Sequence, residues 1–221
     1  MSPDRTDFLY PFIDGGGGDA GPLLADLAAS AAAKAAESER LRAATLERCR
    51  AQVGAAAEAM ADRFRAGGRL LTFGNGGSAT DAEGVAALFC WPPFGVPLPA
   101  RSLAADQAVL TALANDVGFE LVFSRQLIAY GRAEDIAMGI STSGNSVNLL
   151  GAFAEATRRR MLTVGLAGYD GGQMASSVRL DHCLVVHSDS VHRIQETQSA
   201  LAFALWTAVQ AKLEQSDAGL P

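Results

Sequence analysis

Short apolar runs recur along the chain from about residue 69 onward, and most of them end at a turn rich in glycine or serine. Strands of this length alternating with helical segments are typical of a parallel sheet covered on both faces. The pattern therefore predicts an α/β fold, a single three-layer sandwich with a central parallel sheet. The clearest expected strands are "RLLTF" (69–73), "DIAMGI" (135–140), "MLTVGLAG" (161–168) and "DHCLVVH" (181–187). Between the first two, "PARSLA" (99–104) and "VLTALAND" (109–116) flank a further unit, with a strand-like segment before Asp116.

Two helical regions flank the expected sheet. Residues 23–66 are rich in Ala, Glu, Arg and Leu, contain no Pro and have only one Gly, Gly54, so they favour one or two long helices. Val191 to Gln215 is expected to form a long, mostly apolar closing helix. Because long helices with narrow apolar stripes usually need a partner helix, the first region predicts oligomerisation.

The expected domain boundaries follow from composition. Residues 1–22 begin polar, carry the aromatic cluster "FLYPF" (8–12) and then break into four glycines, which indicates a flexible arm. This arm is either a disordered tail or a segment that docks on a neighbouring subunit. Residues 23–215 are expected to form one domain with its N-terminal helical region, and residues 216–221 a short tail.

Composition and charge narrow the classes of function. The 221-residue chain has a net charge of −6 and lacks a clustered basic field, which argues against direct binding to nucleic acid or to an anionic membrane. A small anionic ligand remains compatible, because backbone N–H groups bind phosphate without a net positive charge. The cysteines Cys49, Cys90 and Cys183 have no metal-ligand spacing and are expected to be reduced. We find neither a signal peptide nor an apolar run of about 18 residues, so the chain is expected to be cytoplasmic.

Two strand-to-helix turns have the composition of anion sites. In "GNGGS" (74–78) the glycines allow close backbone approach, and Asn75 and Ser78 add side-chain donors. In "STSGNS" (141–146) four hydroxyls surround Gly144 and Asn145, and a following helix would add its N-terminal N–H groups. A lone serine-rich turn is usually only a helix cap. Two such turns at the carboxyl edge of one parallel sheet instead predict a phosphate site, although neither has the Walker or dinucleotide pattern.

Several ordered motifs resemble those of one family. They are "FGNGGSATDA", "LTALANDVGFELVFSRQL", "GRAEDIAMGISTSGNSVNLL", "GYDGGQMA" and "RIQE", spread over about residues 45–212. They resemble the sugar isomerase (SIS) domain family, and within it the phosphoheptose isomerases, which interconvert sedoheptulose 7-phosphate and a heptose aldose phosphate. The resemblance implies a homotetramer with sites at subunit interfaces. Together with Ser78, the expected substrate-binding residues are Asn75, Gly76, Gly77, Asn115, Asp116, Ser141, Thr142, Ser143, Ser146 and Gln195.

The helix after the glycine turn departs from this resemblance. The isomerases that the chain resembles carry His and Glu four residues apart on this helix, where i and i+4 share a face, but this chain has Gly84 and Leu88. Those isomerases also carry Gln in the "RIQE" motif and His eight residues later, whereas this chain keeps Gln195 but has Phe203. A lone amide cannot hold zinc. No metal and no cofactor are therefore expected.

Two functions remain open at this point. The first is a phosphosugar-binding or regulatory protein that lacks phosphoheptose isomerase catalysis and has a possible protein partner, similar to a branch of the family that associates with the replication initiator. The second is an active aldose–ketose isomerase on sedoheptulose 7-phosphate or a related ketose phosphate, with a rearranged acid–base set. The candidates for that set are His192, Glu196 and Asp116. No recognisable acid–base pair is formed by the remaining nearby carboxylates and histidines, which are Glu83, Asp170, His182 and His187.

Overall fold

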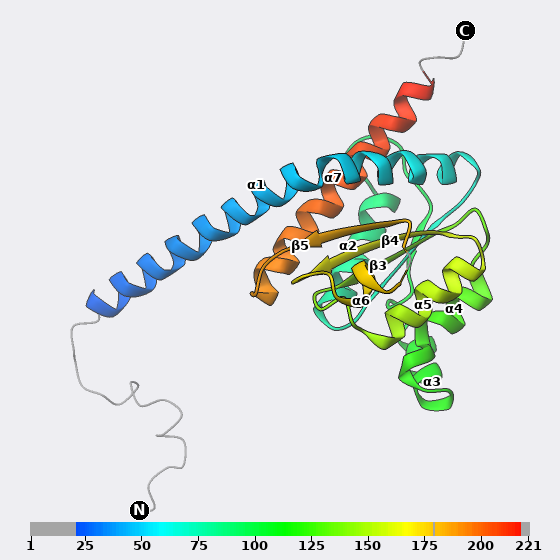
Figure 1. Ribbon diagram of the computed structural model, residues 1–221, viewed down its shortest axis with the longest axis horizontal. Helices are drawn as coiled ribbons and strands as arrows, with labels where there is room; N and C mark the ends of the chain where they lie inside the picture. The colour runs from blue at the N-terminus through cyan, green and yellow to red at the C-terminus, as the bar shows by residue number, and fades with distance from the viewer. Residues whose placement is uncertain (1–20, 179, 218–221) are drawn as a thin grey trace, which may run out of the picture. The chain divides into compact units, whose positions relative to one another are not determined.

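The apolar runs form a five-stranded sheet in which all neighbouring strands are parallel (Figure 1). The structure, a computed structural model, describes residues 21–178 and 180–217. Along the sheet the order is β2-β1-β3-β4-β5. The strands are β1 (Leu70–Gly74), β2 (Ala100–Ser102), β3 (Ile136–Ser141), β4 (Leu162–Gly168) and β5 (His182–Val186). The predicted α/β class with a central parallel sheet is confirmed.

Helices cover both faces of the sheet. They are α1 (Gly21–Arg65), α2 (Gly77–Cys90), α3 (Gln107–Asp116), α4 (Val122–Tyr130), α5 (Val147–Arg158), α6 (Gly172–Ser176) and α7 (Val191–Asp217), with a 3-10 turn η1 (Phe119–Leu121). Successive residues of a strand point to opposite faces. Thus Ile136 and Met138 of β3 belong to the core beneath α1, α2 and α7, whereas Ala137 belongs to the core beneath α4, α5 and α6.

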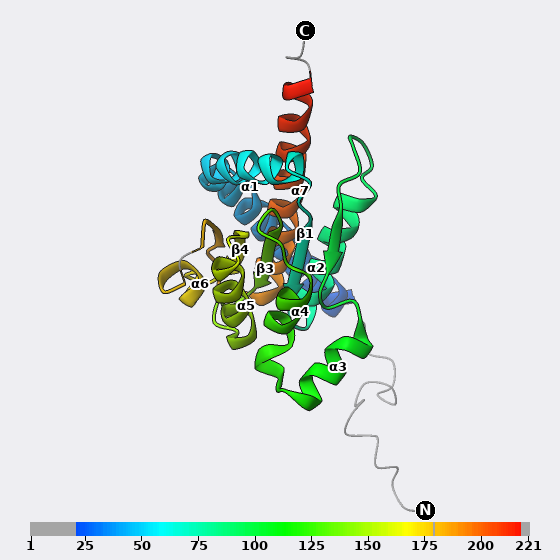
Figure 2. The same ribbon diagram turned by 90° about the vertical axis from the view of Figure 1, so that its right-hand side faces the viewer.

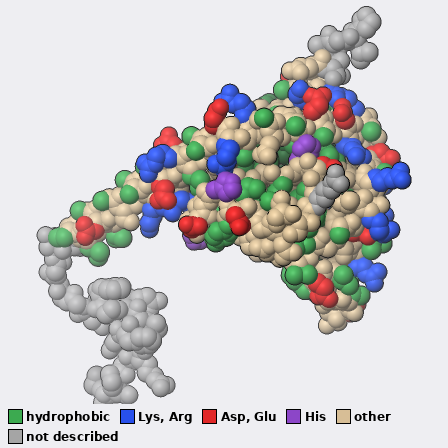
Figure 3. All heavy atoms as spheres, viewed as in Figure 1, with side chains coloured by type: hydrophobic (Ala, Val, Ile, Leu, Met, Phe, Trp, Pro, Cys, Tyr) green, Lys and Arg blue, Asp and Glu red, His purple; other side chains and the backbone are tan. Residues whose placement is uncertain are grey.

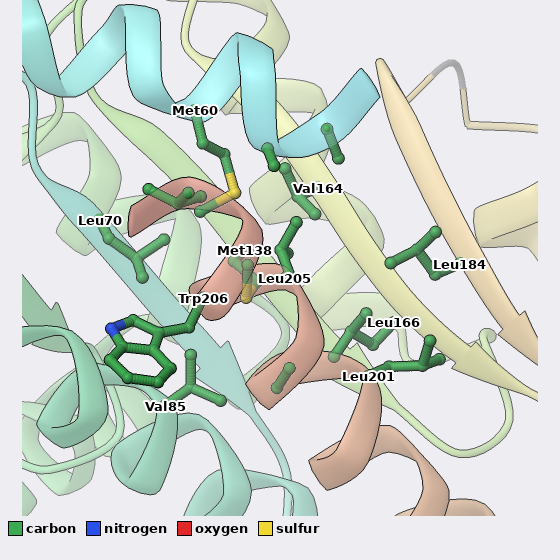
Figure 4. Close-up of a cluster of buried hydrophobic side chains, with 14 of the residues drawn as sticks. Met60, Leu70, Val85, Met138, Val164, Leu166, Leu184, Leu201, Leu205 and Trp206 are labelled. Carbon is green, nitrogen blue, oxygen red and sulfur yellow. The ribbon is translucent and has the colours of Figure 1, made fainter. Parts of the chain in front are cut away.

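The first of these cores is the larger one. Met60 of α1, Val85 of α2 and Trp206 of α7 meet strand residues such as Met138 (Figure 4). Each of these four side chains is at most 6% exposed. Burial of large apolar side chains is the main favourable contribution to folding. This packing fixes α2 and α7 against the sheet.

The N-terminal helical region forms the single helix α1, which begins at Gly21. The chain divides into two compact units, residues 1–39 and 40–221, and the sheet belongs to the second. Within the second unit, α1 buries Cys49, Val53 and Met60, a spacing of four and seven residues that matches one face of a helix. Within the first unit, the apolar residues Leu23, Leu24 and Leu27 are all more than half exposed.

The predicted tail and arm lie mostly outside the described residues. The closing helix α7 extends to Asp217, two residues beyond the expected end at Gln215. The aromatic cluster at 8–12 and the segment 218–221 are not described.

The prediction of a strand-like segment before Asp116 is wrong, because these residues form the end of helix α3. Asp106 caps this helix, and its Oδ1 accepts a hydrogen bond from Val109 N at 3.1 Å. Thr111 Oγ1 donates back to Gln107 O at 2.7 Å within the helix. A short apolar run does not distinguish strand from helix, and the capping aspartate favours the helix here.

Acidic and basic side chains are interspersed over the face drawn in Figure 3. Over the stretch that the structure describes, no helix has both the length and the apolar character needed to cross a membrane.

Candidate functional site

The strand order reverses between β1 and β3, which lie side by side in the centre of the sheet. The chain leaves β1 toward β2 on one side and returns to β3 on the other. In open α/β sheets, ligands bind outside the carboxyl ends of the strands at such a switch point. Gly74 of β1 is paired in register with Ile140 of β3. The glycine turn and the hydroxyl turn therefore emerge from neighbouring strands.

The glycine turn brings backbone close to the start of α7. Gly76 has φ of 55°, a conformation that favours glycine. A Cβ on Gly77 would lie 2.4 Å from Nε2 of Gln195, so the side chain of Gln195 rests against this backbone. Asn75 and Asn148 exchange two amide hydrogen bonds, each of 2.9 Å. This pair joins the glycine turn to the first turn of α5.

The hydroxyl turn gathers its serines around Ser141. The Oγ of Ser141 lies 3.5 Å from Oγ of Ser143 and 3.4 Å from Oγ of Ser146. It also accepts a hydrogen bond from Gly144 N at 3.1 Å. Ser146 is the N-cap of the 12-residue helix α5, yet its side chain makes no capping hydrogen bond. Converging hydroxyls at the N-terminus of a helix whose N-cap side chain is free of a capping bond form an uncharged cradle suited to phosphate. Thr142 lies in the same turn and Ser78 is buried in the first turn of α2.

A cavity of about 260 Å³ lies next to this cradle, between α2 and α7. Gln198, which lines it, donates from Nε2 to the carbonyl oxygen of Ser141 at 3.1 Å. The cavity is therefore directly adjacent to the hydroxyl turn. Its apolar lining is Gly84, Val85, Leu88, Ile140, Ala202 and Phe203, and its polar lining is Thr80, Asp81, Gln198 and Ser199.

Three of the four positions at which the resemblance places metal and acid–base groups come together in this cavity. Gly84, Leu88 and Phe203 all line it. A Cβ built on Gly84 would meet nothing within 4 Å, so the local backbone leaves room for a side chain that this sequence does not supply. The donor set is thus Gln195 beside three apolar residues, which does not fit zinc, an ion that takes four N, O or S ligands. Within residues 21–178 and 180–217, no group of three or more His, Cys, Asp or Glu side chains is placed to hold a metal ion.

Asp81 is the site residue that the sequence interpretation missed. It lines the cavity, and its Oδ2 accepts a hydrogen bond from Gln195 Nε2 at 3.4 Å. Burial raises the pKa of the Asp81 carboxyl, and the hydrogen bond from Gln195 offsets only part of that rise. The signal was available, because Asp81 lies inside the motif "GNGGSATDA". A carboxyl group with a raised pKa in a cavity is a candidate for proton transfer.

The structure does not bring Asn115 and Asp116 to the cavity within one chain. Both end helix α3, where Asn115 Nδ2 donates to Asp116 Oδ1 at 2.8 Å. Helix α3 packs against η1 and α4 and projects from the body of the domain beside α4 (Figures 1 and 2). A role for these two residues in the site therefore needs a second copy of the chain and stays a prediction.

The two other acid–base candidates lie at the start of α7. His192 and Glu196 are exposed, and neither lines the cavity. Gln195, between them, contacts Asp81. The structure thus brings Gln195, but not His192 or Glu196, to a carboxyl group of the cavity.

The remaining candidates have local contacts. Asp170 Oδ1 accepts a hydrogen bond from Gly172 N at 3.1 Å, which is turn chemistry. His187 Nδ1 lies 2.8 Å from the carbonyl oxygen of Tyr169. His182 is the first residue of β5, and Glu83 is exposed on α2.

Comparison with known proteins identifies the family of this chain. The SIS domain matches residues 35–168. The phosphoheptose isomerase of Roseiflexus sp. (strain RS-1) is 42% identical over 171 residues, which cover 76% of this chain and 86% of that protein. The solved phosphoheptose isomerase of Neisseria gonorrhoeae has a TM-score of 0.78 at 38% identity, covering 84% of this chain and 99% of the other. That of Francisella tularensis has the same TM-score at 30% identity, covering 82% and 97%. The chain therefore belongs to the SIS domain family, among the proteins that resemble phosphoheptose isomerase.

Proposed function

We propose that the protein binds a sugar phosphate at the switch point between β1 and β3 and does not catalyse the phosphoheptose isomerase reaction. In this account the hydroxyls of Ser141, Ser143 and Ser146 hold the phosphate. Asn75 and Gln195 contact the sugar. The protein then acts as a binding or regulatory member of its family, through a protein partner.

One observation carries this proposal: Gly84, Leu88 and Phe203 lie together in the cavity beside an intact hydroxyl cradle. Aldose–ketose isomerisation moves a proton between neighbouring carbons, so it needs a positioned acid and base or a metal that polarises the carbonyl. Glycine, leucine and phenylalanine side chains supply neither. Of the four positions at which the resembled isomerases carry metal and acid–base groups, only Gln195 is polar in this chain. We therefore also propose that this chain holds no zinc there.

Asp81 favours a second candidate, an aldose–ketose isomerase with a rearranged acid–base set. Its carboxyl lines the cavity and has a raised pKa, the direction that suits a general acid or base near neutral pH. A single carboxyl group can take a proton from one carbon and return it to the next. The substrate of this alternative is sedoheptulose 7-phosphate or a related ketose phosphate.

The assembly and location of the protein are further parts of the proposal. We infer a homotetramer with sites at subunit interfaces, which would let α3 of a neighbouring copy supply Asn115 and Asp116. The exposed apolar residues of α1 support association through that helix. We expect a cytoplasmic protein without direct nucleic-acid binding.

A calorimetric titration with sedoheptulose 7-phosphate tests the binding proposal. We expect binding to the unaltered protein, and an affinity about tenfold or more lower for Ser143→Ala, because a hydrogen bond to a charged group contributes about 1.5–3 kcal/mol. Thr157→Val is the matched control, since it removes a hydroxyl at the far end of α5, where Thr157 Oγ1 bonds Phe153 O. If neither a sugar phosphate nor inorganic phosphate binds to the protein, the proposal is wrong.

A further inference from the structure

Asn148 is the buried member of the amide pair that joins the glycine turn to helix α5. Its side chain is 3% exposed, whereas Asn75 is only partly buried. Asn75 Nδ2 donates to Asn148 Oδ1, and Asn148 Nδ2 donates back to Asn75 Oδ1, each at 2.9 Å. Asn75 is therefore the member of the pair that a ligand can reach, and Asn148 lies behind it.

The backbone of α5 determines which way both amides face. Leu149 N donates a shared hydrogen bond to Asn148 Oδ1 and to the carbonyl oxygen of Ser146, each at 3.0 Å. Because a backbone N–H can only donate, the Asn148 atom that faces it must be the oxygen. The amide nitrogen of Asn148 then donates to Asn75 Oδ1, so the Asn75 amide is oriented as well. Helix α5 thereby sets the direction of a side chain in the glycine turn.

This orientation leaves Asn75 with groups that suit a sugar hydroxyl. A carboxamide has two N–H donors and two acceptor positions, and the pair uses one of each on both side chains. Asn148 uses its second acceptor position for Leu149 N, whereas Asn75 keeps one N–H and one acceptor position. A hydroxyl donates and accepts, so it can bond to either group. Without Asn148, the ligand itself would have to order the Asn75 amide, which lowers the affinity.

We propose that Asn148 is a positioning residue for sugar-phosphate binding and that it acts through Asn75. Helix α5 then has two roles in the site. Its N-terminus holds the phosphate beside Ser146, and its second residue, Asn148, orients the amide that contacts the sugar. This role rests on the proposed phosphosugar binding and adds to the same site a residue that does not touch the ligand.

Two ligands separate positioning from a general loss of structure. Titration calorimetry of the full chain with Asn148→Ala is expected to give an affinity for sedoheptulose 7-phosphate about tenfold lower, the loss of one good hydrogen bond. The affinity for inorganic phosphate should change less than about twofold, because Leu149 N keeps its bond to Ser146 O and the serine hydroxyls are unaltered. Equal losses for the two ligands, or an unchanged affinity for both, would overturn the proposal.

The Asn75→Ala background provides a second readout. If Asn148 acts through Asn75, adding Asn148→Ala to Asn75→Ala should lower the affinity for sedoheptulose 7-phosphate less than about twofold, because the two effects are not additive. A merely structural role would produce the same loss in both backgrounds. That result would contradict the assignment of Asn148 as a positioning residue.

Gln210→Ala is the matched control. Gln210 is 2% exposed and makes two hydrogen bonds of 2.9 Å with the backbone of Val96, and it does not line the cavity. Its removal eliminates a comparable buried amide pair and should leave both affinities unchanged. Asn148→Ser is a second variant, which keeps an oxygen for Leu149 N but lacks the amide for Asn75, and it should show the same selective loss. A loss in Gln210→Ala as large as in Asn148→Ala would refute the specific role.

Failure of the positioning role is distinguishable from failure of the proposed function. If sedoheptulose 7-phosphate binds to the unaltered protein and equally well to Asn148→Ala, the positioning role is wrong and phosphosugar binding stands. If neither sedoheptulose 7-phosphate nor inorganic phosphate binds to the unaltered protein, both proposals are wrong.

Discussion

Asp81 is the residue whose chemistry depends most on the folded state. Its carboxyl is partly buried between α2 and α7, and the hydrogen bond that it accepts from Gln195 is long, at 3.4 Å. Burial therefore dominates and raises the pKa of Asp81. A group whose pKa is higher in the folded than in the unfolded state binds its proton more tightly when folded. Its ionisation thus lowers the free energy of unfolding as the pH rises.

Asp81→Asn should consequently stabilise the protein near neutral pH. We expect the free energy of unfolding at pH 7 to rise by up to about 1 kcal/mol, and the gain to disappear below the pKa of an unfolded aspartate, about 4. Urea denaturation of both proteins at several pH values measures this difference. A loss of stability at pH 7 would mean that Asp81 makes a stronger charged interaction than its contact with Gln195.

Gly77 shows how one residue connects two segments that are distant in sequence. A Cβ at this position would approach Gln195 Nε2 to 2.4 Å, and the end of a flexible side chain can move aside. We therefore expect Gly77→Ala to fold but to displace Gln195 and to weaken sugar-phosphate binding by about tenfold, the loss of one good hydrogen bond.

Gly54→Ala serves as the control for that substitution. Gly54 lies within α1 and a Cβ there meets nothing within 4 Å. Alanine should stabilise the helix by about 0.5–1 kcal/mol and leave ligand affinity unchanged. Calorimetric titration and thermal denaturation of both variants give the two readouts, and normal affinity in Gly77→Ala would remove Gln195 from the ligand site.

Strands β1 and β3 are held together at their amino ends by an ion pair whose carboxylate is buried and whose arginine is partly exposed. Asp135 is fully buried, and its Oδ2 lies 2.7 Å from Arg69 Nη2. Arg69 N and Arg132 N also donate to this carboxylate, at 2.8 and 3.1 Å. Burial alone would raise the pKa of Asp135, but the hydrogen bonds from Arg69 and Arg132 outweigh it and lower the pKa.

Asp135→Asn should therefore destabilise the fold by about 1–3 kcal/mol at pH 7, because it leaves the donors around the buried carboxylate poorly matched while Arg69 keeps access to water. The sign with pH is opposite to that for Asp81: the contribution of Asp135 is present above about pH 4, the unfolded pKa, and is lost as the pH falls through its lowered folded pKa. Urea denaturation between pH 7 and pH 3 measures it. Asp62→Asn is the control, since the pair of Asp62 with Arg65 is exposed and should contribute less than about 1 kcal/mol. An equal loss of unfolding free energy in Asp135→Asn and Asp62→Asn would refute the role of burial.

At the scale of the whole molecule, the sheet was predictable because each apolar run is short and ends at a turn signal. The two turns at the switch point were predictable for the same reason. By contrast, the segment before Asp116 has an apolar pattern that suits both strand and helix, and the cap at Asp106 favours the helix.

The contents of the cavity were only partly predictable. Gly84, Leu88 and Phe203 could be singled out by their spacing from the turn motifs. The motif around Asp81 marks it as a possible site residue, but its contact with Gln195, 114 residues away in sequence, is visible only in the structure. The contact exists only once α7 has folded back across α2, and no local pattern encodes it.

Incorporation of deuterium from the solvent into sedoheptulose 7-phosphate tests the central claim, phosphosugar binding without isomerisation, most directly. Proton NMR of this sugar in deuterated buffer, with a stoichiometric amount of the protein and with or without added zinc, follows both binding and chemistry, and the Neisseria gonorrhoeae phosphoheptose isomerase is the positive control. We predict broadened resonances of a substrate that stays chemically unchanged. Deuterium beside the carbonyl, or formation of the aldose phosphate, would contradict the account and identify an active acid–base group in the cavity.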